Sequence, residues 1–393
     1  MTTNWVVKAI IVLILFKPTT SWANDIYINQ SGDNIDMTIV QDGENNVISS
    51  VAGNTRKAPI SGNNTSTTFT QTGDNNDIGV YMSAGNGQQT VTQTGNTNYA
   101  TSDCHGNNCS TTITQYGNNN LANLEFGNGG DYDQTGTITQ DGDYNAAGIE
   151  ANGDDNTFVI DQDGDNNAVG GITGAPITGN NNSLSITQNG DYMTFEGHLI
   201  GSNNSLTSFQ GGSANNSFIR VSTVGSNNTG DLRQGKRLDG NVDNNDSGNH
   251  EQYITVVGDG NTVNTSQVNS NGANSDHHMA HIITGDSNTL SHEQFANNKK
   301  QGYIEITGDS NTVSLQQRNG ANHLADINLT GDDHTVTGTQ WGQGGAHNFT
   351  VDLTNSGGAY NMSTTQTSNT AQTYSLTGSC ATVGGCAVSV FQN

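Results

Sequence analysis

A six-residue motif, Gln-x-Gly-x-x-Asn, recurs along this chain at a nearly constant spacing. Its first and last residues are Gln41, Gln71, Gln93, Gln115, Gln140 and Gln162, and Asn46, Asn76, Asn98, Asn120, Asn145 and Asn167. The step is 22 residues from Gln71 to Gln93, from Gln93 to Gln115 and from Gln140 to Gln162. Gln188 and Gln210 repeat this step in degenerate form. A repeat of this length is typical of solenoids, in which each unit buries its apolar face only against its neighbours.

The composition suits short strands and turns better than an ordinary globular core. Only 31% of the 393 residues are hydrophobic and 12% are charged, while 50 are glycine and 3 are proline. Asn, Thr, Ser, Gly and Gln make up the difference, and such residues favour tight turns and side-chain amide ladders. The net charge of −25 argues against a nucleic-acid partner and against adhesion to anionic membranes.

Each repeat carries two turn signals and therefore two strands. A second Gly-Asn turn lies between successive motifs, as at Gly85-Asn86 and Gly127-Asn128. The segments between the turns alternate with period two and are rich in β-branched residues, as in residues 111–115. No long amphipathic helical stripe occurs in the mature chain. We therefore predict an all-β fold, a flattened parallel β-solenoid with strand-turn-strand-turn repeats and strands about 4.8 Å apart.

The alternation also predicts which motif side chains point inward. An apolar residue lies two positions before each glutamine, as Ile113 lies before Gln115 and Val91 before Gln93. Because the apolar residue is buried, the glutamine on the same strand face is buried with it. An isolated buried amide is costly, but identical amides stacked coil over coil can hydrogen-bond to one another. We therefore interpret the motif glutamines and asparagines as structural ladders and not as a binding site.

The motif resembles the curlin repeat, the unit of the curli fibres on bacterial surfaces. The family's Gln-x-Gly-x-x-Asn-x-Ala stands intact at residues 93–100, 115–122 and 140–147, although the family's closing glutamine is absent. The resemblance is good over about residues 24–215 and weaker beyond. It implies a subunit of an extracellular amyloid-type fibre or biofilm matrix. It also implies export through an outer-membrane curli-type pore and a nucleating partner.

The sequence divides into five predicted segments. Residues 1–23 read as a signal peptide, because an apolar run at 9–16 follows Lys8 and is too short to span a bilayer. A retained membrane anchor remains an alternative there, and no later segment could cross a membrane. Residues 24–233 form the curlin-like solenoid, and 234–250 lack alternation and read as an excursion loop. We expect the mature protein to be secreted, to the extracellular space or the cell surface.

A variant repeat is predicted over residues 251–379. Its pattern, Ile-Thr-Gly-Asp-Ser-Asn, is centred on Gly285, Gly308 and, in the related form Leu-Thr-Gly-Asp-Asp-His, Gly331, with steps of 23 residues. Residues 380–393 form a C-terminal segment. The four cysteines are two close pairs, Cys104 with Cys109 and Cys380 with Cys386, and in an exported chain these predict two local disulfides. Neither pair has a second ligand pair at the spacing of a zinc site.

Candidate chemical sites are weak. His277 and His281 would lie about 13 Å apart along a strand, too far to share a metal ion, so we expect them and His278 to be solvated surface residues. No acidic residue stands in a catalytic arrangement, so we predict no enzymatic activity and no cofactor. Weak divalent-cation binding stays open, because stacked coils would align the carboxylates of the Asp-rich turns.

Three functional readings remain. Solenoid ends expose unpaired backbone groups, which favours a homopolymer assembled by end-to-end stacking. A non-polymerising solenoid adhesin or virion-type fibre is the second reading. The third is ice binding by outward Thr-x-Thr rows on a flat face, although the rows break at Val159 and Asp161. The rows are Thr68 and Thr70, Thr90 and Thr92, Thr112 and Thr114, and Thr137 and Thr139.

Overall fold

The computed structural model describes most of the chain beyond residue 23. The described residues are 24–27, 32, 34, 36–49, 60, 63–80, 82, 85–104, 107–126, 133–170, 175–212, 216–241, 249–269, 277–296, 298–319, 322–352, 354, 358–378, 380 and 385–393. The predicted signal peptide, 1–23, lies outside them, as do residues 242–248 of the predicted excursion loop. The described chain divides into two compact units, unit 1 up to Leu184 and unit 2 from Ser185 to Asn393.

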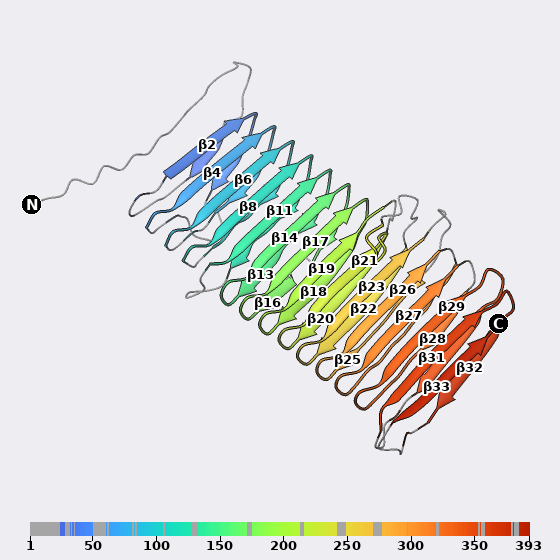
Figure 1. The fold of residues 1–393 in the computed structure, drawn as a ribbon. Coiled ribbons are helices and arrows are strands. Elements are labelled where there is room, and N and C mark those ends of the chain that lie inside the picture. The colour runs from blue at the N-terminus through green and yellow to red at the C-terminus, as the bar shows by residue number, and fades with distance from the viewer. Residues whose placement is uncertain are drawn as a thin grey trace, which may run out of the picture. The chain divides into compact units, whose positions relative to one another are not determined.

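Unit 1 is built from short parallel strands stacked coil over coil, and strand β17 (Ser183–Asn189) runs across its boundary (Figure 1). Its main sheet contains β2 (Asp36–Asp42), β4 (Ser66–Thr72), β6 (Gln88–Thr94), β8 (Ser110–Tyr116), β11 (Thr135–Asp141) and β14 (Thr157–Asp163). The second row contains β1 (Asp25–Tyr27), β3 (Val47–Ser49), β5 (Asp77–Gly79), β7 (Tyr99–Ala100), β9 (Leu121–Ala122), β12 (Ala146–Ala147) and β15 (Ala168–Val169). A third row contains β10 (Glu125–Phe126), β13 (Ile149–Asn152) and β16 (Ala175–Thr178).

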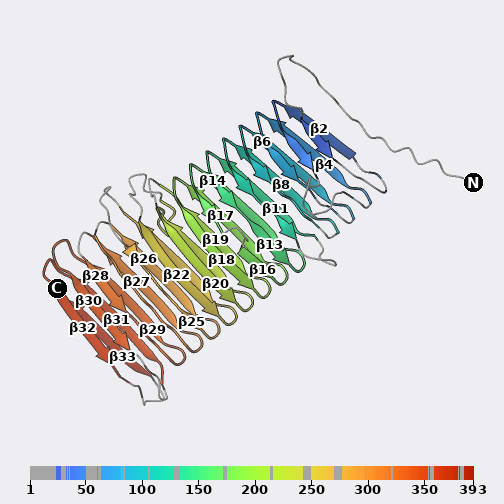
Figure 2. The same cartoon turned by 180° about the vertical axis from the view of Figure 1, so that it is seen from behind.

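Unit 2 repeats this plan, and Figure 2 shows its strands from behind. Its main sheet contains β19 (Ser205–Gln210), β21 (Thr229–Gln234), β23 (Thr262–Val268), β26 (Thr289–Phe295), β27 (Thr312–Arg318), β29 (Thr335–Trp341), β31 (Tyr360–Thr367) and β33 (Cys386–Gln392). The facing rows contain β18 (Thr194–Ile200), β20 (Phe218–Val224), β22 (His250–Val257), β24 (His277–His278), β25 (Ile283–Thr284), β28 (His323–Asp326), β30 (His347–Asp352) and β32 (Gln372–Thr377).

The strands alternate between buried and exposed residues as the sequence predicts. In β4, β6 and β8 every second residue is buried, and the neighbouring strands pair in parallel and in register. The apolar rungs Phe69, Val91 and Ile113 have no exposed surface. The described elements are all strands, so the predicted all-β parallel β-solenoid is confirmed.

Loops at the corners absorb changes in repeat length. Hydrogen-bonded glutamines of successive coils lie between 22 and 33 residues apart, so the 22-residue period is the shortest form of a variable repeat. The 33-residue step runs from Gln234 to Gln267 and includes the predicted excursion loop. Its described part packs on later coils, because Ser266 Oγ donates to Lys236 O at 2.9 Å and Arg237 pairs with Glu293 at 3.5 Å.

The prediction that the three clustered histidines are solvated is wrong for two of them. His277 and His281 have no exposed surface, whereas the His278 side chain is 40% exposed and lies 3.4 Å from Glu251. The reason is parity: His277 and His281 alternate with Met279 and Ile283 along one face, and all four side chains are inside. A neutral imidazole in a ring stack costs far less to bury than a charged one.

Candidate functional site

The six motif glutamines of unit 1 form a continuous ladder of amide hydrogen bonds. Nε2 of each glutamine donates to Oε1 of the next, from Gln41 through Gln71, Gln93, Gln115 and Gln140 to Gln162, at 2.7–2.9 Å. All of them are fully buried except Gln41, which is half-buried. Gln115 Nε2 also donates to the carbonyl oxygen of Tyr99 at 3.1 Å. Both hydrogens of this buried amide are therefore satisfied, which removes the cost of its desolvation.

Unit 2 contains a longer ladder of glutamine side chains, of which the sequence predicted only the first two, Gln188 and Gln210. It runs through Gln188, Gln210, Gln234, Gln267, Gln294, Gln317, Gln340, Gln366 and Gln392 with Nε2–Oε1 distances of 2.7–3.2 Å. The other glutamines of this ladder could have been predicted from the sequence, because each variant turn is followed by a glutamine at a fixed distance. Gln294 follows Asn288 by six residues, and Gln317 follows Asn311 by six.

The motif asparagines form a second ladder at the corner of the coil. Those of unit 1 are buried, and the backbone N–H of Asn98 donates to Oδ1 of Asn76 at 3.0 Å. The Nδ2 of Asn76 donates to Gly95 O at 2.8 Å. In unit 2 the variant-turn asparagines do the same, as Asn288 and Asn311 show. In the coil after Asn311, His334 stands at the asparagine position, and its Nδ1 accepts the backbone N–H of Tyr360 at 3.0 Å.

A further ladder of side-chain to backbone hydrogen bonds, which the sequence analysis did not predict, lies at the position after the turn glycine. The Oδ1 atom of an Asp or Asn there accepts the backbone N–H of the equivalent residue in the preceding coil. Asp143 accepts from Asn118 at 2.7 Å, and Asp309 accepts from Asp286 at 2.8 Å. The signal was present in the sequence, because nearly every Gly-x-x-Asn turn has a residue of this kind directly after its glycine.

The turn glycines are required by the stacking itself. Gly117 has φ +102°, and a Cβ there would overlap the carbonyl oxygen of Gly142 in the next coil. Gly285 in unit 2 has φ +115° and the same relation to Gly308. Only glycine combines this backbone conformation with such a close approach.

The ladders have a direction, and their outermost described strands are edges. Among the described residues β2 pairs only with β4, and β33 pairs only with β31. Within that set, no hydrogen bond ends on Oε1 of Gln41. At the other end Gln392 Oε1 accepts from Gln366, while its Nε2 donates to Thr373 O at 3.3 Å. Unit 1 therefore begins with a side-chain acceptor, and unit 2 ends with a side-chain donor.

The structure joins both cysteine pairs. The Cα atoms of Cys104 and Cys109 are 6.2 Å apart and those of Cys380 and Cys386 are 5.8 Å apart, and each pair is disulfide-bonded. Cys109 directly precedes β8, and Cys386 is the first residue of β33.

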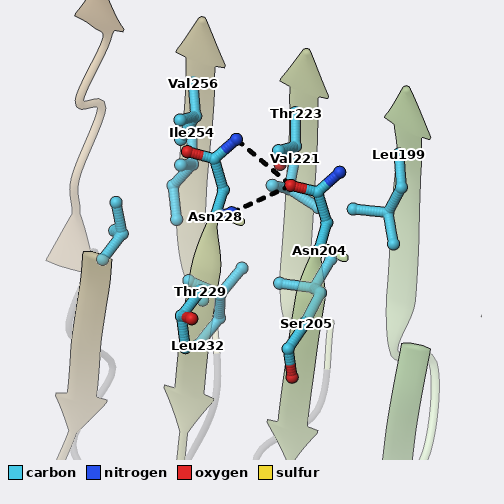
Figure 3. A pocket seen from close by; sticks show the side chains of 13 residues that line it. Leu199, Asn204, Ser205, Val221, Thr223, Asn228, Thr229, Leu232, Ile254 and Val256 are labelled. Carbon is cyan, nitrogen blue, oxygen red and sulfur yellow. Dashed lines mark hydrogen bonds between the residues drawn. The ribbon is translucent and has the colours of Figure 1, made fainter. Parts of the chain in front are cut away.

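The described residues contain no candidate metal centre. No group of three or more His, Cys, Asp or Glu side chains among them could hold a metal ion. A narrow void inside unit 2 is lined by thirteen uncharged residues, including Leu199, Val221 and Leu232 (Figure 3). It adjoins Gly230, which occupies an inward position where its neighbours in register, Leu206 and Val263, carry side chains. The void is therefore a packing gap with no reactive group.

The comparisons with known proteins agree with the geometry. The family model for the curlin associated repeat matches residues 133–164 and 153–190, so the chain carries this repeat. The two matched ranges overlap and lie around the strands that hold Gln140, Gln162 and Gln188. No curated protein matches the chain. No helix capable of crossing a membrane is found among the residues that the structure describes.

Proposed function

We propose that this protein is a secreted structural protein, a curlin-like subunit that stacks end to end into an extracellular fibre or surface coat. The observation that carries the proposal is the direction of the two glutamine ladders, which leaves an open acceptor at Gln41 in unit 1 and a donor at Gln392 in unit 2. An amide ladder is extended by another copy without any new kind of contact. Unpaired strand edges at the same places supply backbone groups for parallel pairing.

Addition of a copy would set β33 of one molecule against β2 of the next. Three outward N–H groups of β33 are available for this pairing. Cys386 N–H donates to Ala359 O at 2.8 Å, and alternate residues of a parallel strand direct their N–H groups to the same side. The N–H groups of Ala387, Ser389 and Phe391 therefore point away from β31. The side chain of Phe391, 70% exposed, would be partly covered by such a contact.

Export through an outer-membrane curli-type pore, nucleation by a partner and an amyloid or biofilm role belong to the same proposal. They rest on the repeat family and on the predicted signal peptide. The proposal includes no enzymatic activity, in keeping with a repeat whose motif glutamines and asparagines hydrogen-bond from coil to coil.

Paired substitutions on β33 test end-to-end stacking. Ser389→Pro removes an outward N–H and leaves the bonds to β31 intact, whereas Ser389→Ala keeps the N–H and is the matched control. We expect fibres in negative-stain images of the mature protein and of Ser389→Ala, and single short particles for Ser389→Pro. Fibres from all three proteins would show that β33 is not the interface. Single particles from all three would favour the non-polymerising adhesin or virion-type fibre.

A second candidate is favoured by the outward threonines of unit 1. Thr68, Thr90, Thr112 and Thr137 are in register across four strands, and Thr70, Thr92, Thr114 and Thr139 form a parallel row. Strands about 4.8 Å apart make this a regular array of hydroxyl and methyl groups, a surface suited to ordering water or binding ice. Measurement of thermal hysteresis decides the matter, because an ice-binding face must produce it and a fibre subunit has no need of it.

A further inference from the structure

Unit 2 contains a column of basic side chains in its interior, which we name the base column. Its members are His250, His277, Lys300, His323 and His347, and each is at most 2% exposed. Backbone pairing places them in register from coil to coil: His250 pairs with His277, Lys300 bridges to His277 and His323, and His323 pairs with His347. The next residue in register is Gln372.

The rings of the base column stack on one another. The ring centroids of His250 and His277 are 4.8 Å apart, and those of His323 and His347 are 5.0 Å apart with nearly parallel planes. Lys300 lies between these two pairs, and its Nζ donates to Asn319 O at 2.7 Å. Two imidazolium ions at such a distance repel each other strongly in a buried setting.

The hydrogen bonds fix which nitrogen of two imidazoles carries a hydrogen. His277 Nε2 lies 3.0 Å from Ala296 O and His323 Nε2 lies 2.9 Å from Arg318 O. A carbonyl oxygen only accepts, so both Nε2 atoms carry the hydrogen. Both Nδ1 atoms are buried and have no hydrogen-bond partner among the described residues. A proton added to either Nδ1 would create a buried cation without an acceptor.

The charged groups nearby give these imidazoles no anionic partner. On the outer face Glu251 is 3.4 Å from His278, and on β26 the buried Glu293 forms ion pairs with Arg318 and Arg237. Lys299 lies beside Lys300, Asp326 ends β28 and Asp352 ends β30. The ladder amides that line the same interior, Gln294 and Gln317, are uncharged. The charged influences on His277 come from His250 and Lys300, and those on His323 come from Lys300 and His347, and all of them disfavour a further proton.

Three more buried imidazoles extend the same chemistry. His281 and His292 meet edge to face at 5.2 Å, and neither nitrogen of His281 has a partner among the described residues. His334 Nδ1 is an acceptor in the corner ladder, so its protonation would break the bond from Tyr360. Burial lowers the pKa of His323 to about 3 and that of His292 to about 4. It lowers the pKa of Lys300 to about 7.

We propose that the base column makes unit 2 sensitive to acid. When the medium is acidified, protonation of its buried imidazoles opens the coils of unit 2 between β22 and β30, while unit 1 stays folded. The sign follows from proton linkage. Below the ordinary imidazole pKa of about 6.5 the opened chain binds protons that the closed coils exclude, so acid favours opening. The described part of unit 1 contains no histidine, since His105, the one histidine in its sequence, lies outside the described residues.

Hydrogen–deuterium exchange of the full mature chain, followed by mass spectrometry, tests the proposal within one molecule. Rates at pH 7.5 and pH 5.0 are each corrected for the intrinsic pH dependence of amide exchange. We expect peptides from β22 to β30 to lose protection at least tenfold at pH 5.0, while peptides from β4 to β14 change less than twofold. Equal changes in the two units, or none in unit 2, would overturn the proposal.

Variants separate the base column from general acid effects. His277→Gln, His323→Gln and His347→Gln combined put a neutral amide where Gln372 already stands in register. We expect this variant to keep its protection at pH 5.0, and His198→Gln, on the outer face of β18, to lose protection as the unchanged protein does. An acid response that survives the triple substitution overturns the proposal. If the triple variant is open already at pH 7.5, the comparison of the two units in the unchanged chain still decides.

Discussion

The first coils of unit 1 and the coils of unit 2 close opposite corners around the same kind of glutamine ladder. The last coils of unit 1 close both corners, since Asn156 before Gln162 and Asn167 after it each belong to an asparagine ladder. In the first coils of unit 1 the Gly-x-x-Asn turn follows the ladder glutamine, as Asn120 follows Gln115 by five residues. In unit 2 the turn precedes the glutamine, as Asn288 precedes Gln294 by six. The inward glutamine is therefore independent of which corner is tight. In unit 2 the corner after the glutamine leads into the base column, as His323 follows Gln317 by six residues.

This difference teaches how a solenoid tolerates variation. In most of the described coils a tight turn with in-register asparagines and glycines fixes one corner. The opposite corner is free to change in length and in chemistry, so unit 2 accepts a 33-residue step and five buried bases at one position. We therefore expect substitutions in the turn glycines and the glutamine ladder to lower the free energy of unfolding equally in both units. Only the base column should make unit 2 respond differently.

The largest expected effect is at the turn glycines, and it should be equal in the two units. Gly117→Ala and Gly285→Ala each place a Cβ against the next coil's backbone at a positive φ, and we expect each to cost about 3 kcal/mol or more. Gly79→Ala is the control, since its Cβ would meet Ala100 O at an ordinary 3.8 Å. Denaturant unfolding monitored by circular dichroism measures all three. A cost confined to one unit would show that the two turns are not equivalent.

The next effect is the loss of a ladder rung. Gln115→Ala in unit 1 and Gln317→Ala in unit 2 each leave amide groups on two neighbours unpaired, which costs about 1–3 kcal/mol. Thr114→Ala, on the outward face beside Gln115, should cost less than about 0.5 kcal/mol. The same unfolding assay compares them. If Thr114→Ala is the more damaging change, the inward assignment of the glutamines is wrong.

The acid effect should appear in unit 2 alone and depend on single histidines. His323→Gln should stabilise the protein at pH 5 by up to about 2 kcal/mol, because the folded pKa of about 3 lies well below the unfolded value. At pH 7.5, above both values, the protonation contribution vanishes. Unfolding midpoints at the two pH values give the difference. A gain that is the same at both pH values would point to packing instead of protonation.

The smallest expected effect is the difference in stability loss between two aspartates of the same repeat, Asp143 and Asp141. Asp143→Ala removes the acceptor for Asn118 N–H and should cost about 1 kcal/mol. Asp141→Ala, at an exposed position of the same repeat, should cost less than about 0.5 kcal/mol. Thermal unfolding of the two variants is the measurement. Equal costs would mean that the corner ladder contributes nothing beyond the turn itself.

The fold class could be predicted because the repeat period and the alternation are local properties of the sequence. The same alternation pointed Gln115 inward, next to Ile113, where the structure has it. The rungs from Gln234 onward lack the Gln-x-Gly motif, because in unit 2 the turn glycine comes before the glutamine, and the motif therefore did not predict them. The burial of His277 was missed, although Met279 and Ile283 share its face, because the prediction rested on the spacing of the histidines and not on the alternation around them. The sequence before His250 and His277 carries no period, so the register across it could not be predicted.

The central claim is that one buried amide ladder holds each unit, and its side-chain hydrogens report on it directly. Protein labelled with ¹⁵N-glutamine allows the exchange of each Nε2 group with deuterium to be followed by nuclear magnetic resonance at neutral pH. We expect slow exchange for Gln93 and Gln115 in unit 1 and for Gln267 and Gln317 in unit 2, and immediate exchange for the exposed Gln88. Ladder glutamines that exchange as fast as Gln88 in either unit would contradict the account.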